Sequence, residues 1–246
     1  TPQLKVLRMP YVLGGRTFQA IRFQTVNERG FLAWNYDQES GVLIRSVTSS
    51  VGGPIQGPLA QGDSREGHTM ITHNDIREVR AIAIPWASDP MPAWVRELRV
   101  LRYDGQMTAT AYPGASPVVF PISVTFERQY LGPNWARYVQ QVKAPGYNPP
   151  LARVFGSAQF AGLWVPPAAL GRLQPGQVLD QDRVTGVVTS VGQIGQLAGN
   201  INGVVISLVG SGFRLDQVYD RQSGVLAYSS RVEKFLRYEV RLAHWQ

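Results

Sequence analysis

The 246-residue sequence contains no cysteine, which excludes disulfide bonds, thiolate nucleophiles and cysteine-ligated metal or iron–sulfur sites. No apolar run approaches the roughly 20 residues that a membrane-spanning helix requires, so we expect no membrane-spanning segment. Charged residues make up only 17% of the chain, whereas hydrophobic residues make up 44%. A chain of this length and composition buries a sizeable core without a covalent staple.

Lysine is also scarce: only Lys5, Lys143 and Lys234 contribute to the 24 basic residues, so the net charge of +7 comes from arginine. The arginines are scattered along the chain instead of forming a stripe or a tail. Because nucleic-acid binders concentrate positive charge against phosphates, we predict no nucleic-acid partner. The lack of cysteine, the low lysine content and the abundance of Gln, Ser, Gly and Pro favour an extracytoplasmic location, meaning periplasmic, secreted or at the cell surface.

Catalytic motifs are missing as well. The sequence has no Gly-x-Ser-x-Gly elbow, P-loop or Gly-x-Gly-x-x-Gly fingerprint. His68 and His73 are five residues apart, a spacing that puts two side chains on opposite faces of a strand, so we predict no metal site. Glu78 and Glu239 have arginine neighbours, which favours surface ion pairs over paired catalytic carboxylates. We therefore predict a protein that is not an enzyme and has no cofactor.

Short alternating runs, bounded by Gly, Pro, Asp and Asn, recur about every ten residues and are typical of β-strands. We predict an all-β fold: a curved antiparallel sheet or half-open barrel built of meanders and hairpins. Residues 92–98 and 167–172 are predicted to form one or two short helical turns, because each begins with proline. The length is compatible with a single β domain over residues 1–246. The Gly- and Pro-rich residues 51–67 are predicted to form a functional loop.

One hairpin sequence occurs three times, at residues 36–43, 182–188 and 219–226. In each copy an Asp precedes a Gly by four residues, so the Asp side chain can bond the turn backbone while Gly adopts a positive φ. The residues Tyr103-Asp104-Gly105 predict a fourth hairpin by the Asp-Gly rule.

Two copies belong to a longer internal similarity. The offset between Tyr36 and Tyr219 is 183 residues, and strand-like runs flank both hairpins at the same offset. This pattern indicates a possible duplication of a three-stranded meander, at residues 17–50 and 200–232. The other interpretation is that a favourable hairpin sequence is used twice independently.

Tryptophans are the candidate ligand-binding residues. Most of the six fall at strand ends beside Pro or Gly, where an indole either plugs the core or forms the wall of an apolar pocket. The candidates are Trp34, Trp86, Trp94, Trp135 and Trp164.

The Tyr-Asp-x-x-Ser-Gly-Val-Leu hairpins at residues 35–45 and 218–228 resemble those of bacterial envelope β proteins related to the outer-membrane lipoprotein carriers. The resemblance covers about a quarter of the chain and implies a curved half-barrel whose apolar concavity binds acyl chains or partner segments. It carries over no functional residue. The chain departs from that pattern because it has no cysteine for lipid attachment and has a Pro-rich middle.

The leading hypothesis is a non-enzymatic exported protein that binds an apolar small molecule or lipid in the concavity of a β-sheet, with residues 51–67 as a possible lid. The alternative is a structural or assembly component of the bacterial cell surface, whose partner is another envelope protein. A second alternative is a carbohydrate-binding or carbohydrate-active protein that uses paired Glu and stacked Trp side chains.

Overall fold

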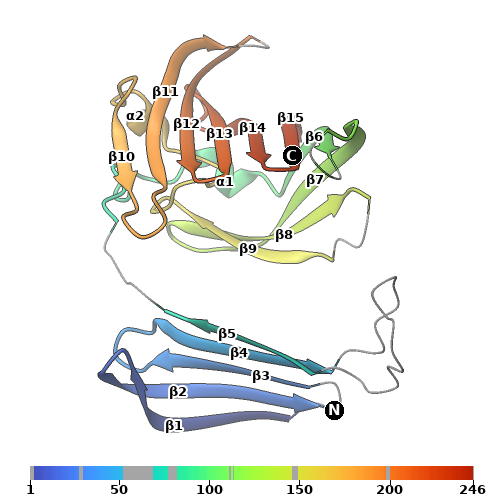
Figure 1. Cartoon of the computed structure of the whole chain (residues 1–246). Coiled ribbons are helices and arrows are strands. Elements are labelled where there is room, and N and C mark those ends of the chain that lie inside the picture. The colour runs from blue at the N-terminus through green and yellow to red at the C-terminus, as the bar shows by residue number, and fades with distance from the viewer. Residues whose placement is uncertain are drawn as a thin grey trace. The chain divides into compact units, whose positions relative to one another are not determined.

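A computed structural model describes residues 3–27, 30–51, 69–76, 82–110, 112, 114–145, 149–197 and 200–245. It confirms the prediction of an all-β fold with antiparallel sheets and two short helices (Figure 1). The chain divides into two compact units, Thr1–Arg80 and Ala81–Gln246. Each unit is described by itself below. The loop predicted at residues 51–67 lies, except for Val51, outside the described residues.

The first unit is a five-stranded antiparallel sheet in which every strand pairs with its neighbour in sequence. Its strands are β1 (Gln3–Leu13), β2 (Arg16–Asn27), β3 (Gly30–Asp37), β4 (Leu43–Val51) and β5 (Thr69–Asp75).

The second unit is a ten-stranded antiparallel sheet with the order β10-β11-β12-β13-β14-β15-β6-β7-β8-β9. It consists of two sequential meanders, joined where β15 pairs with β6. Two short helices accompany the sheet, α1 (Ala93–Glu97) and α2 (Pro167–Leu170). The strands of the first meander are β6 (Val100–Ala109), β7 (Val118–Leu131), β8 (Trp135–Lys143) and β9 (Leu151–Gly156). Those of the second are β10 (Val178–Gln181), β11 (Val188–Leu197), β12 (Ile201–Gly210), β13 (Phe213–Asp220), β14 (Leu226–Glu233) and β15 (Leu236–Trp245).

The ten-stranded sheet is curved, and β8 and β9 bend away from the plane of β11 to β13 (Figure 1). A hydrophobic core lies on the concave side of the sheet, and α1 contributes Val95 to it. Val95 of α1 is fully buried, and its carbonyl accepts a hydrogen bond from Arg128 of β7. Trp94 of the same helix donates from its indole nitrogen to the carbonyl of Ser223, at 2.8 Å. The helix thereby ties both meanders together.

The three predicted hairpins are confirmed. In the first, the Gly41 amide donates to the carbonyl of Asp37 at 2.9 Å, and the Asp37 carboxylate accepts from the Ser40 amide at 3.0 Å. The third copy repeats both bonds with Gly224, Asp220 and Ser223. The glycines at the ends of the three turns have φ of +68°, +70° and +74°, a conformation that disfavours any residue with a Cβ.

The duplicated meander is present in register as well as in sequence. In the first unit Ile21 pairs with Tyr36, and Tyr36 pairs with Leu43 after a register shift. In the second unit Val204 pairs with Tyr219, and Tyr219 pairs with Leu226 after the same shift. The meander β2-β3-β4 therefore matches β12-β13-β14 at the offset of 183 residues. The two copies lie in different sheets, a point that the sequence left open.

The fourth predicted hairpin is wrong. Tyr103, Asp104 and Gly105 lie in the middle of β6, which continues from Val100 to Ala109. Gly105 is needed there for a close approach between strands: a Cβ at this position would lie 1.8 Å from the carbonyl oxygen of Glu239 on β15. The dipeptide that commonly forms a turn here marks tight strand packing instead.

Candidate functional site

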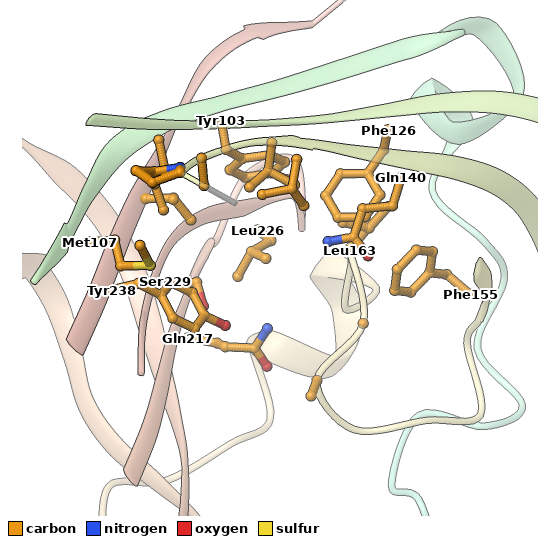
Figure 2. A pocket seen from close by; sticks show the side chains of 18 residues that line it. Tyr103, Met107, Phe126, Gln140, Phe155, Leu163, Gln217, Leu226, Ser229 and Tyr238 are labelled. Atoms are coloured by element: carbon orange, nitrogen blue, oxygen red, sulfur yellow. The ribbon is translucent and has the colours of Figure 1, made fainter. Parts of the chain in front are cut away.

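A cavity of about 340 Å³ lies on the concave side of the ten-stranded sheet (Figure 2). Its lining comes from both meanders and from residues 161–163. This volume is at the lower end of the range of about 300–1,000 Å³ found for ligand pockets in proteins. The cavity therefore has room for a small molecule or one short chain.

Strand alternation positions most of the lining side chains. Tyr103 and Met107 of β6, like Val124 and Phe126 of β7, are separated by an even number of residues and point to the same face. Most of the lining is aliphatic or aromatic, and Figure 2 shows the rings of Tyr103, Phe126, Phe155 and Tyr238 around the space. A site of this kind binds by burying apolar surface.

Residues 161–163 cross the concave side and help to enclose the cavity. The Tyr219 hydroxyl donates to the Gly162 carbonyl at 2.9 Å, and the Leu226 amide donates to the Leu163 carbonyl at 2.9 Å. Ala161 has a φ of +56°, which a residue with a Cβ rarely adopts. This segment is therefore held in place by the duplicated meander.

Five side chains with polar groups interrupt the apolar lining: Tyr103, Gln140, Gln217, Ser229 and Tyr238. Gln217 is 4% exposed, and its side-chain amide lies 3.2 Å from the Tyr219 hydroxyl oxygen, whose single proton is donated to the Gly162 carbonyl. The hydroxyl of Tyr103 is buried and has no hydrogen-bond partner among the described residues. Because buried polar groups are normally satisfied, this hydroxyl is available to a bound molecule.

Three buried tyrosines share this core. Burial raises the pKa of Tyr138 to about 12, an effect that Arg128 partly opposes, and burial also raises the pKa of Tyr103 and Tyr219. The neighbouring Tyr219 and Tyr138 raise the pKa of Tyr103 further. All three phenols therefore stay neutral at physiological pH, and they act as hydrogen-bonding groups without charge.

Alkaline pH is expected to destabilise the second unit. The raised pKa of these phenols means that the folded state holds their protons more tightly than the unfolded chain, whose tyrosines titrate near 10. Their contribution to stability is complete below pH of about 10 and is lost as the pH rises through about 12 for Tyr138. We expect tyrosinate absorbance to lag behind that of the urea-unfolded protein and to rise together with loss of circular dichroism. Full tyrosine ionisation near pH 10 with the sheet intact would contradict this expectation.

The five candidate tryptophans all lie in the described part of the chain, and none of them lines this cavity. Trp86 and Trp164 are fully buried core residues. Trp86 packs edge-on against Phe160, with ring centroids 5.6 Å apart, and Trp164 packs edge-on against Trp94 at 6.3 Å. These three indoles plug the core of the second unit.

The other two tryptophans lie elsewhere. Trp34 is on β3 of the first unit, opposite Phe23 of β2. Trp135 begins β8, is 38% exposed and stacks on Tyr130, with ring centroids 5.2 Å apart. Trp34 thus belongs to the first unit and the other four candidates to the second, where Trp94 packs on Trp164 and Trp135 contacts Tyr130.

The described residues contain no group of three His, Asp or Glu side chains arranged to hold a metal ion. Glu239 forms an ion pair with Arg237, as the alternating charges indicated, whereas Glu78 lies outside the described residues. Glu233 forms a further ion pair, with Arg231. Within the described ranges, no helix has both the length and the apolar character needed to cross a membrane.

Sequence reasoning missed the polar residues of the cavity. Tyr103 was assigned to a turn, and Gln140, Gln217 and Ser229 carry no motif. The signal available was the alternation of β8, which places Gln140 on the same face as the buried Ala136 and Tyr138. A neutral polar residue among inward-facing apolar ones is a candidate for contact with a ligand.

No protein-family model matches the chain, and no curated protein is similar to it in sequence.

Proposed function

We propose that the second unit binds an apolar small molecule or a single-chain lipid in the cavity of its curved sheet, as a non-enzymatic, extracytoplasmic binding protein. The observation that carries this proposal is a cavity of about 340 Å³ with a mostly apolar lining from both meanders. Burial of a chain there contributes about 0.8 kcal/mol per methylene before the cost of ordering the ligand. The resemblance of the hairpins to those of envelope lipid carriers supports the same function.

The test is native mass spectrometry of protein purified without detergent, followed by denaturing spectra of the same sample. We expect an additional mass of small-molecule or lipid size that is lost on denaturation. A bare monomer, from cells in which apolar metabolites are abundant, would count against the proposal.

A substitution that fills the cavity sharpens this test. Val142 of β8 lines the cavity, and Val142→Trp adds an indole to the space that the ligand would occupy. We expect binding to fall by about tenfold or more, because overpacking opposes ligand entry. Gln141→Trp is the matched control, since Gln141 is exposed on the opposite face of the same strand. Equal binding by both variants would place the ligand outside this cavity.

A role in assembly at the cell surface is the second candidate, and a specific observation in the first unit favours it. β1 is an edge strand of the five-stranded sheet, and Leu4, Val6 and Val12 on it are 58%, 55% and 65% exposed. An edge strand with exposed apolar side chains is suited to pairing with another protein. The same native spectra test this candidate, which predicts an oligomer or a bound protein partner.

A further inference from the structure

We propose that the ligand of the cavity is an uncharged molecule that presents a hydrogen-bond acceptor, such as the carbonyl of an ester or ketone, on an apolar body. This inference rests on the proposed function and narrows it to one chemical class. It follows from three properties of the site: the absence of charged side chains in the lining, the hydrogen-bond donors that Gln140 and Tyr103 leave available, and the volume of the cavity.

The cavity offers no charge to a ligand. None of its described lining residues is Asp, Glu, Lys, Arg or His, and burial raises the pKa of the Tyr103 phenol, which keeps it uncharged at neutral pH. A carboxylate or phosphate taken out of water into such surroundings loses its hydration without gaining a cation. A fatty acid or a phospholipid headgroup is therefore disfavoured inside the cavity.

Arg153 is the one cation that forms a hydrogen bond with a lining side chain among the described residues. It lies on β9, is exposed, and donates from Nε to the amide oxygen of Gln140 at 3.0 Å. This bond occupies the acceptor end of the Gln140 amide and leaves its NH₂ group free to donate to a ligand.

Gln217 lies on the other meander. The Tyr219 hydroxyl carries one proton and donates it to the Gly162 carbonyl at 2.9 Å, so its oxygen is left to accept, and the Gln217 amide 3.2 Å away can present either end to the cavity. Figure 2 shows Gln140 and Gln217 on different sides of the cavity. The NH₂ group of Gln140 and the hydroxyls of Tyr103 and Ser229 are donors in the lining, and a ligand that satisfies them must bring an acceptor.

The size of the cavity sets a further limit. About 340 Å³ is small for a lipid with two long chains and fits one short chain or a compact ring system. The chemical class is therefore a neutral, single-chain or cyclic molecule with one or two carbonyl or ether oxygens.

Three probes of equal chain length separate the possibilities: methyl dodecanoate, dodecanoate and dodecane. We expect the complete protein to bind methyl dodecanoate with about tenfold higher affinity than it binds either of the other two probes at neutral pH. The affinities are measured by native mass spectrometry after delipidation of the protein. Gln140→Leu is expected to weaken ester binding by about fivefold to tenfold and to leave dodecane unchanged. Gln141→Leu, which alters the opposite face of the same strand, should leave both unchanged.

The outcomes distinguish this inference from the function on which it rests. Dodecanoate that binds the unaltered protein as tightly as the ester does, and that binds Arg153→Gln more weakly, would overturn the neutral-ligand inference. The proposed apolar binding site would be retained. Equal binding of ester and dodecane would show that the donors are not used and would overturn it too. Failure of all three probes to bind would overturn the proposed function itself. Circular dichroism of each variant confirms that the fold is retained.

Discussion

Replacing Gly224 by alanine is expected to destabilise the second unit by about 4 kcal/mol or more, whereas Gly41→Ala should cost about 1–2 kcal/mol. The two glycines occupy equivalent places in the duplicated hairpins, with φ of +74° and +68°. A Cβ at Gly224 would lie 2.1 Å from the carbonyl oxygen of Val165, whereas one at Gly41 would meet nothing within 4 Å. The difference between the variants therefore isolates the effect of the segment that packs on the second hairpin.

The cost at Gly224 is large because this segment is bonded to the hairpin on both sides. The Val165 amide donates to the Gly224 carbonyl, and the Leu226 amide donates to the Leu163 carbonyl, both at 2.9 Å. Urea unfolding followed by tryptophan fluorescence is the measurement: five of the six tryptophans report on the second unit, for Gly224→Ala, and Trp34 reports on the first unit, for Gly41→Ala. Similar losses in the two variants would mean that only the φ of the glycine matters.

Trp164→Ala is expected to lower the free energy of unfolding by about 3–5 kcal/mol. Trp164 is 1% exposed, forms a β-bridge with Val225 and packs edge-on against Trp94. Removing the indole leaves a void in the core between the helix α1 and the hairpin β13–β14. The measurement is the urea midpoint, with the slope checked for loss of two-state behaviour.

Trp135→Ala is the control for this substitution and should cost about 1 kcal/mol, because the Trp135 side chain is 38% exposed and its ring stacks on that of Tyr130 at the surface. Ligand binding gives a second readout. Trp164 does not line the cavity, so a conservative Trp164→Phe variant should bind the ligand with little change. A large loss of binding in a stable Trp164→Phe variant would return this residue to the role of pocket wall.

Local chemistry made much of the fold predictable. An Asp that bonds the turn backbone and a Gly with positive φ specify a hairpin within a few residues, so all three copies were found. The constant offset between Tyr36 and Tyr219 likewise identified the duplicated meander. Proline at the start of α1 and α2 located both helices.

The cavity was not predictable from these signals, because its residues meet only through pairings that are distant in sequence. Tyr103 faces the cavity because β6 pairs with β15, and no local pattern indicates that partner. The hairpin predicted at Gly105 was wrong for a related reason. Glycine is required there because the neighbouring strand β15 leaves no room for a Cβ, and not because the chain turns. The tryptophans show the same limit, since a residue at a strand end plugs the core or lines a pocket according to what lies opposite.

The pairing of β15 with β6 also determines when the second unit can complete its sheet. On the ribosome, β6 to β9 emerge early as a meander with β6 at an open edge, and that edge finds its partner only after residues 236–245 have been made. Folding that depends on contacts of such large sequence separation is slow, and the waiting edge is prone to pairing with other chains. The joining of the two meanders into one ten-stranded sheet is thus a late, cooperative step in folding. Aggregation competes with folding in the interval before this step.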